Sequence, residues 1–295
     1  MRDWWRPGVV VPALVMLVVA LVSGVVWLRE ASTGDGEEGD DAFRFAVIGD
    51  FGTGDQFERE VAAAVRAWVE VRPTDALITT GDNVYENGEP EDFDEAWHEP
   101  YGWVQEQGLE VVASLGNHDV RHNDGKDVME LLDMPGPWYT TRLGAAEVIV
   151  LDANRPKDEE QKEWLAETLA ASEASWQVAV FHQPVYSCST HESTVAVINN
   201  WLPLLHDGGV DLVLNGHDHN YQRFQDDTIT YVVEGASGAE LYRVSECEGD
   251  EPEQVAAHDD SRSFMTVEGD TDELRLAALD PEGDVVDEAV LTAGT

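Results

Sequence analysis

Apolar and polar positions follow two rhythms along most of this 295-residue chain. Compact apolar runs predict buried strands at 43–48, 75–80, 109–115, 147–151, 176–181 and 210–214. Apolar residues at helical spacing predict helices between several of these runs, at 56–71, 159–171 and 195–206. Strands that alternate with helices in this way predict a layered α/β domain.

The rhythm changes towards the end of the chain. The pattern of strands separated by Gly/Asp turns, with no helix between them, recurs at 228–233, 264–268, 274–279 and 285–291. We expect these strands to complete a second sheet packed on the first. Residues 246–262 are acidic and show no periodicity, which predicts an exposed loop.

The N-terminal residues differ in kind from the rest. Residues 7–28 contain no charged side chain and, at about 1.5 Å per residue in a helix, could cross a ~30 Å hydrocarbon layer. Arg2 and Arg6 precede this run, which favours a cytoplasmic N-terminus. A cleaved signal peptide is the alternative, although its apolar stretch usually has only about 7–15 residues before a small-x-small site.

Three segments follow from this pattern: a membrane anchor (or signal peptide) at 1–30, an acidic linker at 31–41 and a folded domain at 42–295. The stretch TGDGEEGDD in the linker has no apolar side chain, so we expect a solvated, self-repelling tether. The domain would be extracytoplasmic, held to the lipid bilayer through residues 7–28, or secreted after signal cleavage.

The chain carries a formal net charge of −43, from 60 Asp and Glu against 17 Lys and Arg. Such a surface repels itself at low salt, because exposed charges within a Debye length of ~10 Å are poorly screened. We therefore expect adaptation to high salt rather than a specific basic partner. No nucleic acid partner is expected, because nothing on this surface would displace counterions from a phosphate backbone. Nothing in the sequence implies an obligate protein partner.

Two cysteines, Cys188 and Cys247, would lie outside the cytoplasm in this topology. A disulfide between them could contribute ~4 kcal/mol in the chain-entropy model. Two unpaired thiols are the alternative, because sequence spacing does not show whether their Cα atoms approach.

Short motifs supply the side chains that bind metal ions: GDFG with Asp50, GDNVY with Asp82, GNHD with Asn117, FHQP with His182 and GHDHN with His217. Each motif follows a predicted strand, and the carboxyl ends of strands in an α/β sheet are where binding groups converge. Carboxylates, an amide and imidazoles together suit two hard or borderline cations held side by side. The chemistry implied is hydrolysis of a phosphate ester by a bridged pair of metals.

These motifs resemble those of the calcineurin-like metallophosphoesterases and, within them, most closely those of purple acid phosphatases of the short, tartrate-resistant type. The resemblance runs from about residue 43 to residue 291. It implies an α/β fold in four layers, a β-sandwich of two mixed sheets flanked by helices, with the metal site at the carboxyl edge of the strands. The sequence departs from the family in its apparent anchor, where a secreted form is common, and in its far more negative charge.

A paired substitution supports the finer placement. Most of the superfamily has Asp-x-His in the first motif, but this sequence has Gly52 where that His would bind the first metal. The second motif supplies Tyr85 three residues after Asp82, as GDxxY does in purple acid phosphatases. The resemblance implies a phenolate that holds a ferric ion and gives a charge-transfer colour. A packing aromatic is the alternative for an isolated tyrosine.

The resemblance implies two cations, Fe(III) in the first position and a divalent Fe, Zn or Mn in the second. Asp82 would bridge them. The remaining ligands would divide into a first-metal set and a second-metal set, namely Asp50, Tyr85 and His219, and Asn117, His182 and His217. The first set offers hard anionic oxygens to the trivalent ion, and the second offers imidazoles and an amide to the softer one.

Three further residues are candidates for catalysis. His118 matches the family's outer-sphere histidine, which contacts substrate phosphate and protonates the leaving group. Asp119 would either orient His118 or cap the turn. His191 matches a second substrate histidine of the tartrate-resistant type, with an ordinary surface histidine as the alternative.

The expected function is that of a binuclear-metal phosphomonoesterase, an acid phosphatase-like enzyme that hydrolyses small phosphate esters by a metal-bound hydroxide. A phosphodiesterase or nucleotide pyrophosphatase on the same scaffold is one alternative, which the loops 86–103 and 122–138 would decide. A surface protein that keeps its metals for stability, without turnover, is another.

Overall fold

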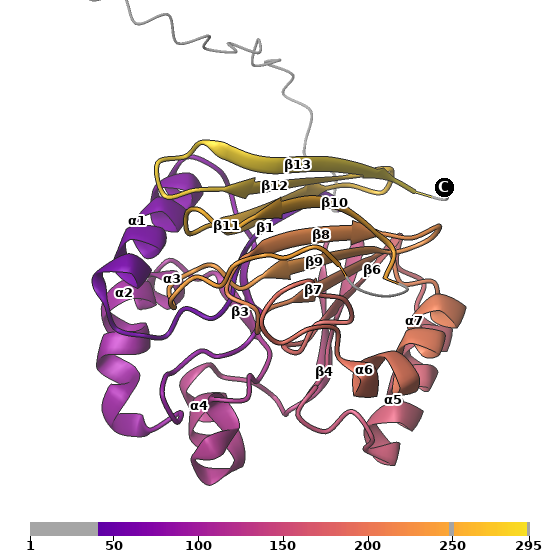
Figure 1. Cartoon of the computed structure of the whole chain (residues 1–295), viewed down its shortest axis with the longest axis horizontal. Coiled ribbons are helices and arrows are strands. Elements are labelled where there is room, and N and C mark those ends of the chain that lie inside the picture. The colour runs from indigo at the N-terminus through magenta and orange to yellow at the C-terminus, as the bar shows by residue number, and fades with distance from the viewer. Residues whose placement is uncertain (1–40, 248–250, 294–295) are drawn as a thin grey trace, which may run out of the picture. The chain divides into compact units, whose positions relative to one another are not determined.

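Two β-sheets packed face to face form the centre of the domain, with helices on both outer faces (Figure 1). The computed structural model describes residues 41–247 and 251–293, and within these ranges no helix is long and apolar enough to cross a bilayer. The expected anchor at 1–30 and nearly all of the expected linker lie outside the described residues. The predicted α/β class, with two mixed sheets between helices, is confirmed.

The first sheet has six strands in the order β13-β12-β11-β1-β2-β3. Its strands are β1 (Phe43–Ile48), β2 (Ala76–Thr79), β3 (Glu110–Ala113), β11 (Phe264–Gly269), β12 (Glu273–Leu279) and β13 (Val285–Thr292). The first three are parallel, and β11 pairs antiparallel with β1 in the register Val47↔Met265.

The expectation that the C-terminal strands would build the second sheet is wrong for β11, β12 and β13. Strand β1 pairs with β2 along one edge, which leaves its other edge for a second partner. The buried apolar run at the start of β11 pairs with that other edge. The last strands therefore extend the sheet that the first strands begin.

The second sheet has seven strands in the order β10-β8-β9-β7-β6-β5-β4. Its strands are β4 (Tyr139–Leu143), β5 (Ala146–Val150), β6 (Trp176–Val180), β7 (Leu212–Asn215), β8 (Tyr221–Gln225), β9 (Thr230–Glu234) and β10 (Glu253–His258). The four strands β5, β6, β7 and β9 are parallel.

The predicted exposed loop at 246–262 is wrong where it contains β10. This edge strand pairs antiparallel with β8, and Gln254 Nε2 donates to Gln222 Oε1 at 2.9 Å. Its residues are exposed or only half-buried, so no apolar run in the sequence indicates a strand here. Main-chain hydrogen bonds to the neighbouring strand hold it in place, and these leave no hydrophobic pattern in a sequence.

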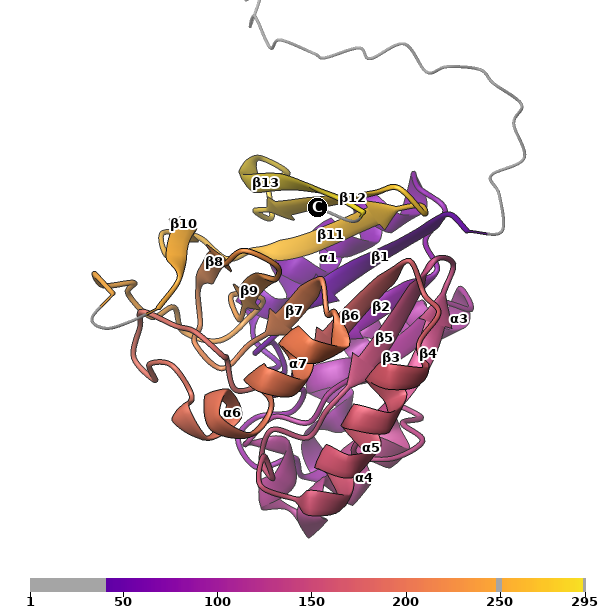
Figure 2. The same ribbon diagram turned by 90° about the vertical axis from the view of Figure 1, so that its right-hand side faces the viewer.

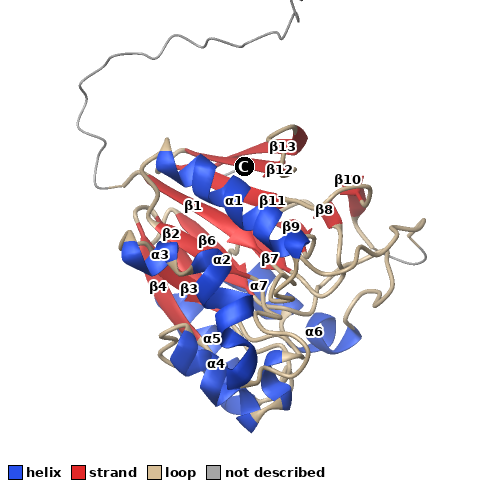
Figure 3. Cartoon of the chain, turned by 90° about the vertical axis from the view of Figure 1, so that its left-hand side faces the viewer, coloured by secondary structure: helices blue, strands red, loops and turns tan. Residues whose placement is uncertain are grey.

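The helices lie on the two outer faces of the sandwich (Figures 2 and 3). The longer ones are α1 (Gln56–Glu70), α4 (Lys126–Leu131), α5 (Glu159–Ala171), α6 (Val195–Asn200) and α7 (Leu202–Gly208). Short helical segments are η1 (Pro90–Asp92), η2 (Asp94–His98), α2 (Glu99–Tyr101), α3 (Trp103–Glu106), η3 (Asp119–Arg121) and η4 (Asn123–Gly125). Helices α1–α4 pack with the outer face of the first sheet, and α5–α7 with that of the second.

Local chemistry explains where helices begin and break. Asp55 caps α1, because its carboxylate accepts hydrogen bonds from the amides of Phe57 and Glu58. The single helix predicted at 195–206 is instead two, since α6 ends before Trp201 and α7 starts afresh with a proline in its first turn. Proline has no N–H to continue the hydrogen bonds of the preceding helix.

A disulfide joins Cys188 to Cys247, whose Cα atoms lie 4.9 Å apart. Of the two states left open by the sequence, the paired one is present. The bond ties the loop after β6 to the segment that follows β9, and Ser245 N donates to Cys188 O beside it at 2.8 Å. Both segments begin at the carboxyl edge of the second sheet, where β6 and β9 end.

Candidate metal centre

The first-metal set converges at the ends of β1, β2 and β7. The hydroxyl of Tyr85 donates to Asp50 Oδ1 at 3.2 Å and lies 3.2 Å from His219 Nε2. His219 Nε2 is 3.5 Å from Asp50 Oδ1. Ligands bound to one cation at about 2.1 Å are separated by about 3 Å when adjacent, so this spacing fits a shared ion.

The second-metal set converges beside the first. His182 Nε2 lies 3.1 Å from Asn117 Oδ1 and 3.2 Å from His217 Nδ1. Asn117 follows β3, His182 follows β6 and His217 follows β7. Residues that are 35 to 100 positions apart in the chain thus present one oxygen and two nitrogen atoms to one point.

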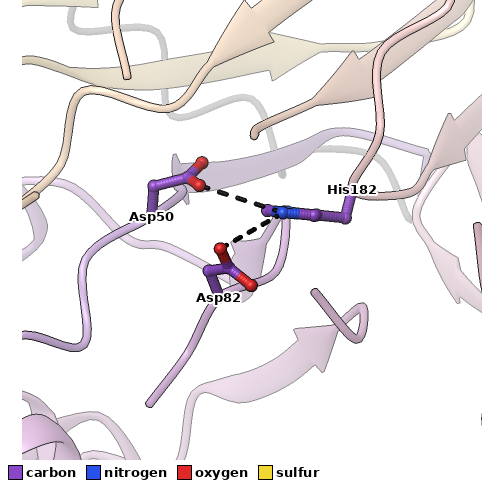
Figure 4. A group of neighbouring side chains, drawn as sticks. All are labelled: Asp50, Asp82 and His182. Atoms are coloured by element: carbon purple, nitrogen blue, oxygen red, sulfur yellow. Dashed lines mark ion pairs between the residues drawn. The ribbon is translucent and has the colours of Figure 1, made fainter. Parts of the chain in front are cut away.

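Asp82 lies against the second set and close to the first. Its Oδ2 is 3.3 Å from His182 Nε2, and His182 Nε2 is 3.9 Å from Asp50 Oδ1. Asp50, Asp82 and His182 point toward one another (Figure 4), and their ligand atoms all lie within 4.8 Å. All three side chains are buried. A carboxylate at this place suits the bridging role expected for Asp82.

The main chain at these positions is strained. Asp50, Asp82 and His217 have φ values of 53°, 51° and 74°, in the left-handed region that residues with a Cβ rarely adopt. Such conformations cluster at functional sites, where the surrounding structure imposes them. Here they turn the chain sharply after a strand, so that the side chain points into the centre.

The glycine that replaces the expected histidine ligand is enclosed by main chain. A Cβ atom at Gly52 would overlap the carbonyl oxygen of Asn83. The Gly52 carbonyl accepts a hydrogen bond from the amide of Tyr85 at 2.8 Å. The segment that carries Tyr85 therefore packs directly on the position that a histidine would need. A side chain at position 52 is therefore sterically incompatible with this placement of the segment that carries Tyr85.

Hydrogen bonds from the outer side orient the imidazoles. His182 Nδ1 lies 2.9 Å from the carbonyl oxygen of Thr80, and His219 Nδ1 lies 2.8 Å from that of Glu240. A carbonyl oxygen only accepts, so each Nδ1 carries the hydrogen, and in the neutral ring Nε2 has its lone pair toward the centre. This is the tautomer that a metal ligand requires.

The buried titratable groups of this cluster favour the binding of a cation. Burial raises the pKa of Asp50 well above its usual range, with His182 opposing this and Asp82 adding to it. Burial, followed by the Asp50 carboxylate, also raises the pKa of Tyr85. Burial lowers the pKa of His182, but the carboxylates of Asp82 and Asp50 outweigh it and raise that pKa to about 10. Without cations such a cluster would hold protons, and bound cations would displace them.

The three candidate catalytic residues lie at different depths. The ring of His118 contacts that of Tyr85 at 4.4 Å, and its Nε2 is 3.9 Å from Asp82 Oδ2. The exposed ring of His191 stacks on His217 at 4.1 Å. Both histidines thus border the centre, whereas Asp119 is fully buried.

The hydrogen bonds of Asp119 fit the capping role considered for it, while its role in catalysis stays a prediction. Its carboxylate accepts from the amides of Gly116, Asn83 and Val84 at 2.8 to 3.0 Å, and from Asn83 Nδ2. It thereby holds two motif loops together. The ring of His118 is held instead by the carbonyl oxygen of Glu86, 2.8 Å from its Nδ1.

Residues outside the motifs also border the site. Tyr242 stacks on His219 at 4.0 Å and meets the ring of His191 at 5.6 Å. Arg121 Nη2 lies 3.2 Å from His118 Nε2. Sequence reasoning missed these residues and the Glu86 carbonyl. Main-chain carbonyls have no residue signature, Tyr242 is remote from every motif, and only its position three residues after His118 could have indicated Arg121.

Comparison with known families decides what kind of site this is. Residues 43–221 match the family of calcineurin-like phosphoesterases, a stretch that covers more than half of the chain and contains every motif residue. The chain is a calcineurin-like phosphoesterase. As a member of this family it is a metal-dependent phosphoric ester hydrolase, so the class of enzyme expected from the motifs is confirmed.

Similar proteins place this calcineurin-like phosphoesterase near the purple acid phosphatases. Purple acid phosphatase 3 of Arabidopsis thaliana is 26% identical over 285 residues, covering 84% of this chain and 77% of that protein. Tartrate-resistant acid phosphatase type 5 of Homo sapiens is 28% identical over 237 residues, covering 66% and 73%. Purple acid phosphatase PPD1 from yellow lupin seeds shares the fold, with a TM-score of 0.73 at 16% identity over 85% of this chain and 54% of that one.

Proposed function

We propose that this phosphoesterase is a binuclear-metal phosphomonoesterase of the acid phosphatase type. The observation that supports it most directly is the pair of ligand sets, each with donor atoms about 3 Å apart, joined through His182 and Asp82. The same residues fit two ions of different hardness. The first set brings a carboxylate and a phenol, and the second brings an amide and imidazoles. Fe(III) in the first position and divalent Fe, Zn or Mn in the second would match them.

Two bound cations would lower the pKa of a shared water and neutralise the charge that develops on the phosphoryl group. The protein's own residues would orient the ester around them. His118 faces the centre with its Nε2 and would donate a proton or a hydrogen bond to the leaving oxygen. His191, stacked on His217, would contact the phosphate from the opposite side.

Metal analysis combined with a substrate panel tests this proposal. The purified protein should contain about two equivalents of metal and absorb in the visible when oxidised, and it should hydrolyse a monoester such as p-nitrophenyl phosphate. A preference for bis(p-nitrophenyl) phosphate would favour the phosphodiesterase alternative. Metal-replete protein that hydrolyses neither ester would favour the non-catalytic alternative.

We also propose that residues 7–28 hold the domain outside the cytoplasm. The disulfide Cys188–Cys247 supports this, because such bonds form and persist mainly in oxidising compartments. Mass analysis of the N-terminus of membrane and soluble fractions tests it. Recovery of a chain that lacks the apolar run would show signal cleavage instead of anchoring.

A further inference from the structure

Arg121 lies at the rim of the centre, at the end of the short segment η3, which begins at the last residue of the GNHD motif. Its Nη1 donates to the carbonyl oxygen of Glu86 at 3.0 Å, and its Nη2 lies 3.2 Å from His118 Nε2. The side chain is 43% exposed, so solvent reaches the guanidinium group. A cation is therefore held in place next to the histidine expected to meet the substrate.

One acceptor holds both side chains. The Glu86 carbonyl oxygen receives Nη1 of Arg121 and Nδ1 of His118, which lies 2.8 Å away. Each group is thus fixed at one nitrogen, and their second nitrogens, Arg121 Nη2 and His118 Nε2, lie 3.2 Å apart. His118 Nε2 lies 3.9 Å from Asp82 Oδ2, so this pair of nitrogens borders the metal ligands.

The guanidinium retains hydrogen-bonding capacity after these contacts. Arginine has five N–H donors in a planar fork, and the Glu86 carbonyl and the ring nitrogen of His118 use two of them. Its nearest carboxylate oxygen, Glu86 Oε2, is 3.8 Å from Nη1 on a side chain that is 76% exposed. An exposed pair at that distance contributes little. In a chain with 60 acids, this guanidinium faces a ring nitrogen at the site rather than a close carboxylate.

We propose that Arg121 is a substrate-binding residue that, together with His118, donates to one phosphoryl oxygen of the bound ester. A phosphoryl oxygen within hydrogen-bond distance of both Nη2 and the protonated Nε2 would accept from both and replace their mutual contact, and arginine binds phosphate oxygens through charge-assisted hydrogen bonds. The inference rests on the proposed phosphatase function and adds a specific phosphate contact to it. It also supplies a local positive group where the overall charge of −43 would repel an anionic substrate.

Full-length protein carrying Arg121→Met tests the inference, with Arg121→Lys as the conservative variant. Arg66→Met is the control, because it removes the same charge from α1, where Arg66 pairs with Glu70. We expect Arg121→Met to raise both the Kd for inorganic phosphate and the KM for p-nitrophenyl phosphate by about tenfold or more, the usual effect of losing a hydrogen bond to a charged group. Arg121→Lys should recover part of this, and Arg66→Met should shift both constants by less than about twofold.

Several results would overturn the inference. A Kd and KM within about twofold of wild type in Arg121→Met would show that the guanidinium does not touch phosphate. Loss of bound metal in that variant, or an equal rise in Glu86→Gln, would show that Arg121 only supports the neighbouring loop. Phosphate binding is measured by calorimetric titration and needs no turnover. Failure of the proposed function would appear separately, as wild-type protein that hydrolyses no ester.

Discussion

Carboxylates occur in two contrasting regions of this protein, the metal centre and the solvent-exposed exterior. Asp50, Asp82 and Asp119 are buried, and main-chain amides or a phenol donate to each of them. Acids such as Glu60 and Glu106 are exposed, so water and dissolved salt screen them. The same functional group is thus held by specific donors in one region and by the solvent in the other. Changing a carboxylate should have a large, local effect in the centre and a small, collective effect outside it.

Loss of Asp82 should have the largest effect of any single change. We expect Asp82→Ala to lose both metals and essentially all activity, because this carboxylate would bridge the two ligand sets. Metal analysis and an esterase assay measure both outcomes, and Asp227→Ala removes an exposed carboxylate as the control. One full equivalent of metal in Asp82→Ala would show that the residue does not bridge.

Replacing His118 should act on turnover without emptying the centre. We expect His118→Ala to lower kcat about 10²–10⁴-fold, the usual range for a general acid, with the metal content unchanged. The loss should shrink for esters with good leaving groups, which need no proton. His122→Ala, which changes a histidine that pairs with Asp127 outside the centre, is the control. Equal losses for good and poor leaving groups would assign His118 to phosphate binding instead.

The phenol of Tyr85 can be removed with little change in shape. If it ligates Fe(III), the oxidised protein should absorb in the visible and Tyr85→Phe should abolish that band, while the ring keeps its contact with His118. Tyr186→Phe, which alters a tyrosine packed on Tyr231, should leave the spectrum unchanged. Colourless wild-type protein that is active with Mn or Zn would rule out the ferric assignment.

Glu58 is an exception to the contrast between the metal centre and the exterior, because it is a buried acid outside the ligand sets. Burial raises its pKa to about 9, although the amide of Gly54 donates to it at 2.6 Å. The folded state therefore keeps a proton that the unfolded chain releases above its ordinary pKa of 4.5, so stability falls as pH rises from there to about 9.

Substituting Glu58 isolates that contribution. We expect Glu58→Gln to be more stable than wild type by about 3 kcal/mol at pH 7, since each pH unit in the window is worth about 1.4 kcal/mol. The two proteins should converge near pH 4, and chemical denaturation across the range measures the difference. Glu60→Gln, which changes an exposed acid on the same helix, is the control. A difference that does not vary with pH would contradict the assignment.

The exterior acids should respond to salt rather than to any one substitution. We expect residues 42–295, produced alone, to gain thermal stability from 0.1 M to molar KCl, as salt screens the repulsion among the acids. Screening should be nearly complete by ~1 M, where the Debye length is ~3 Å. Further stabilisation beyond that would indicate bound cations or strengthened apolar burial. Equal melting temperatures at 0.1 M and 3 M would refute the salt-adaptation hypothesis.

The alternation of strands and helices and the motifs after the strands were readable from the sequence alone. Each depends on residues close together in the chain, such as the apolar runs of β1 and β7 or the helical spacing of apolar residues in α1. Family motifs also predicted which side chains would converge, because parallel strands bring their carboxyl ends to one edge. The burial of Asp50 and His182 follows from that placement.

Tertiary structure alone decided how distant segments pair. The edge strand β10, the addition of β11 to β1, and the disulfide Cys188–Cys247 all join residues far apart in the chain, and none has a local signature. The same holds for the Glu86 carbonyl that orients both His118 and Arg121. A main-chain acceptor is present at every residue, so only the folded geometry selects the one that is used.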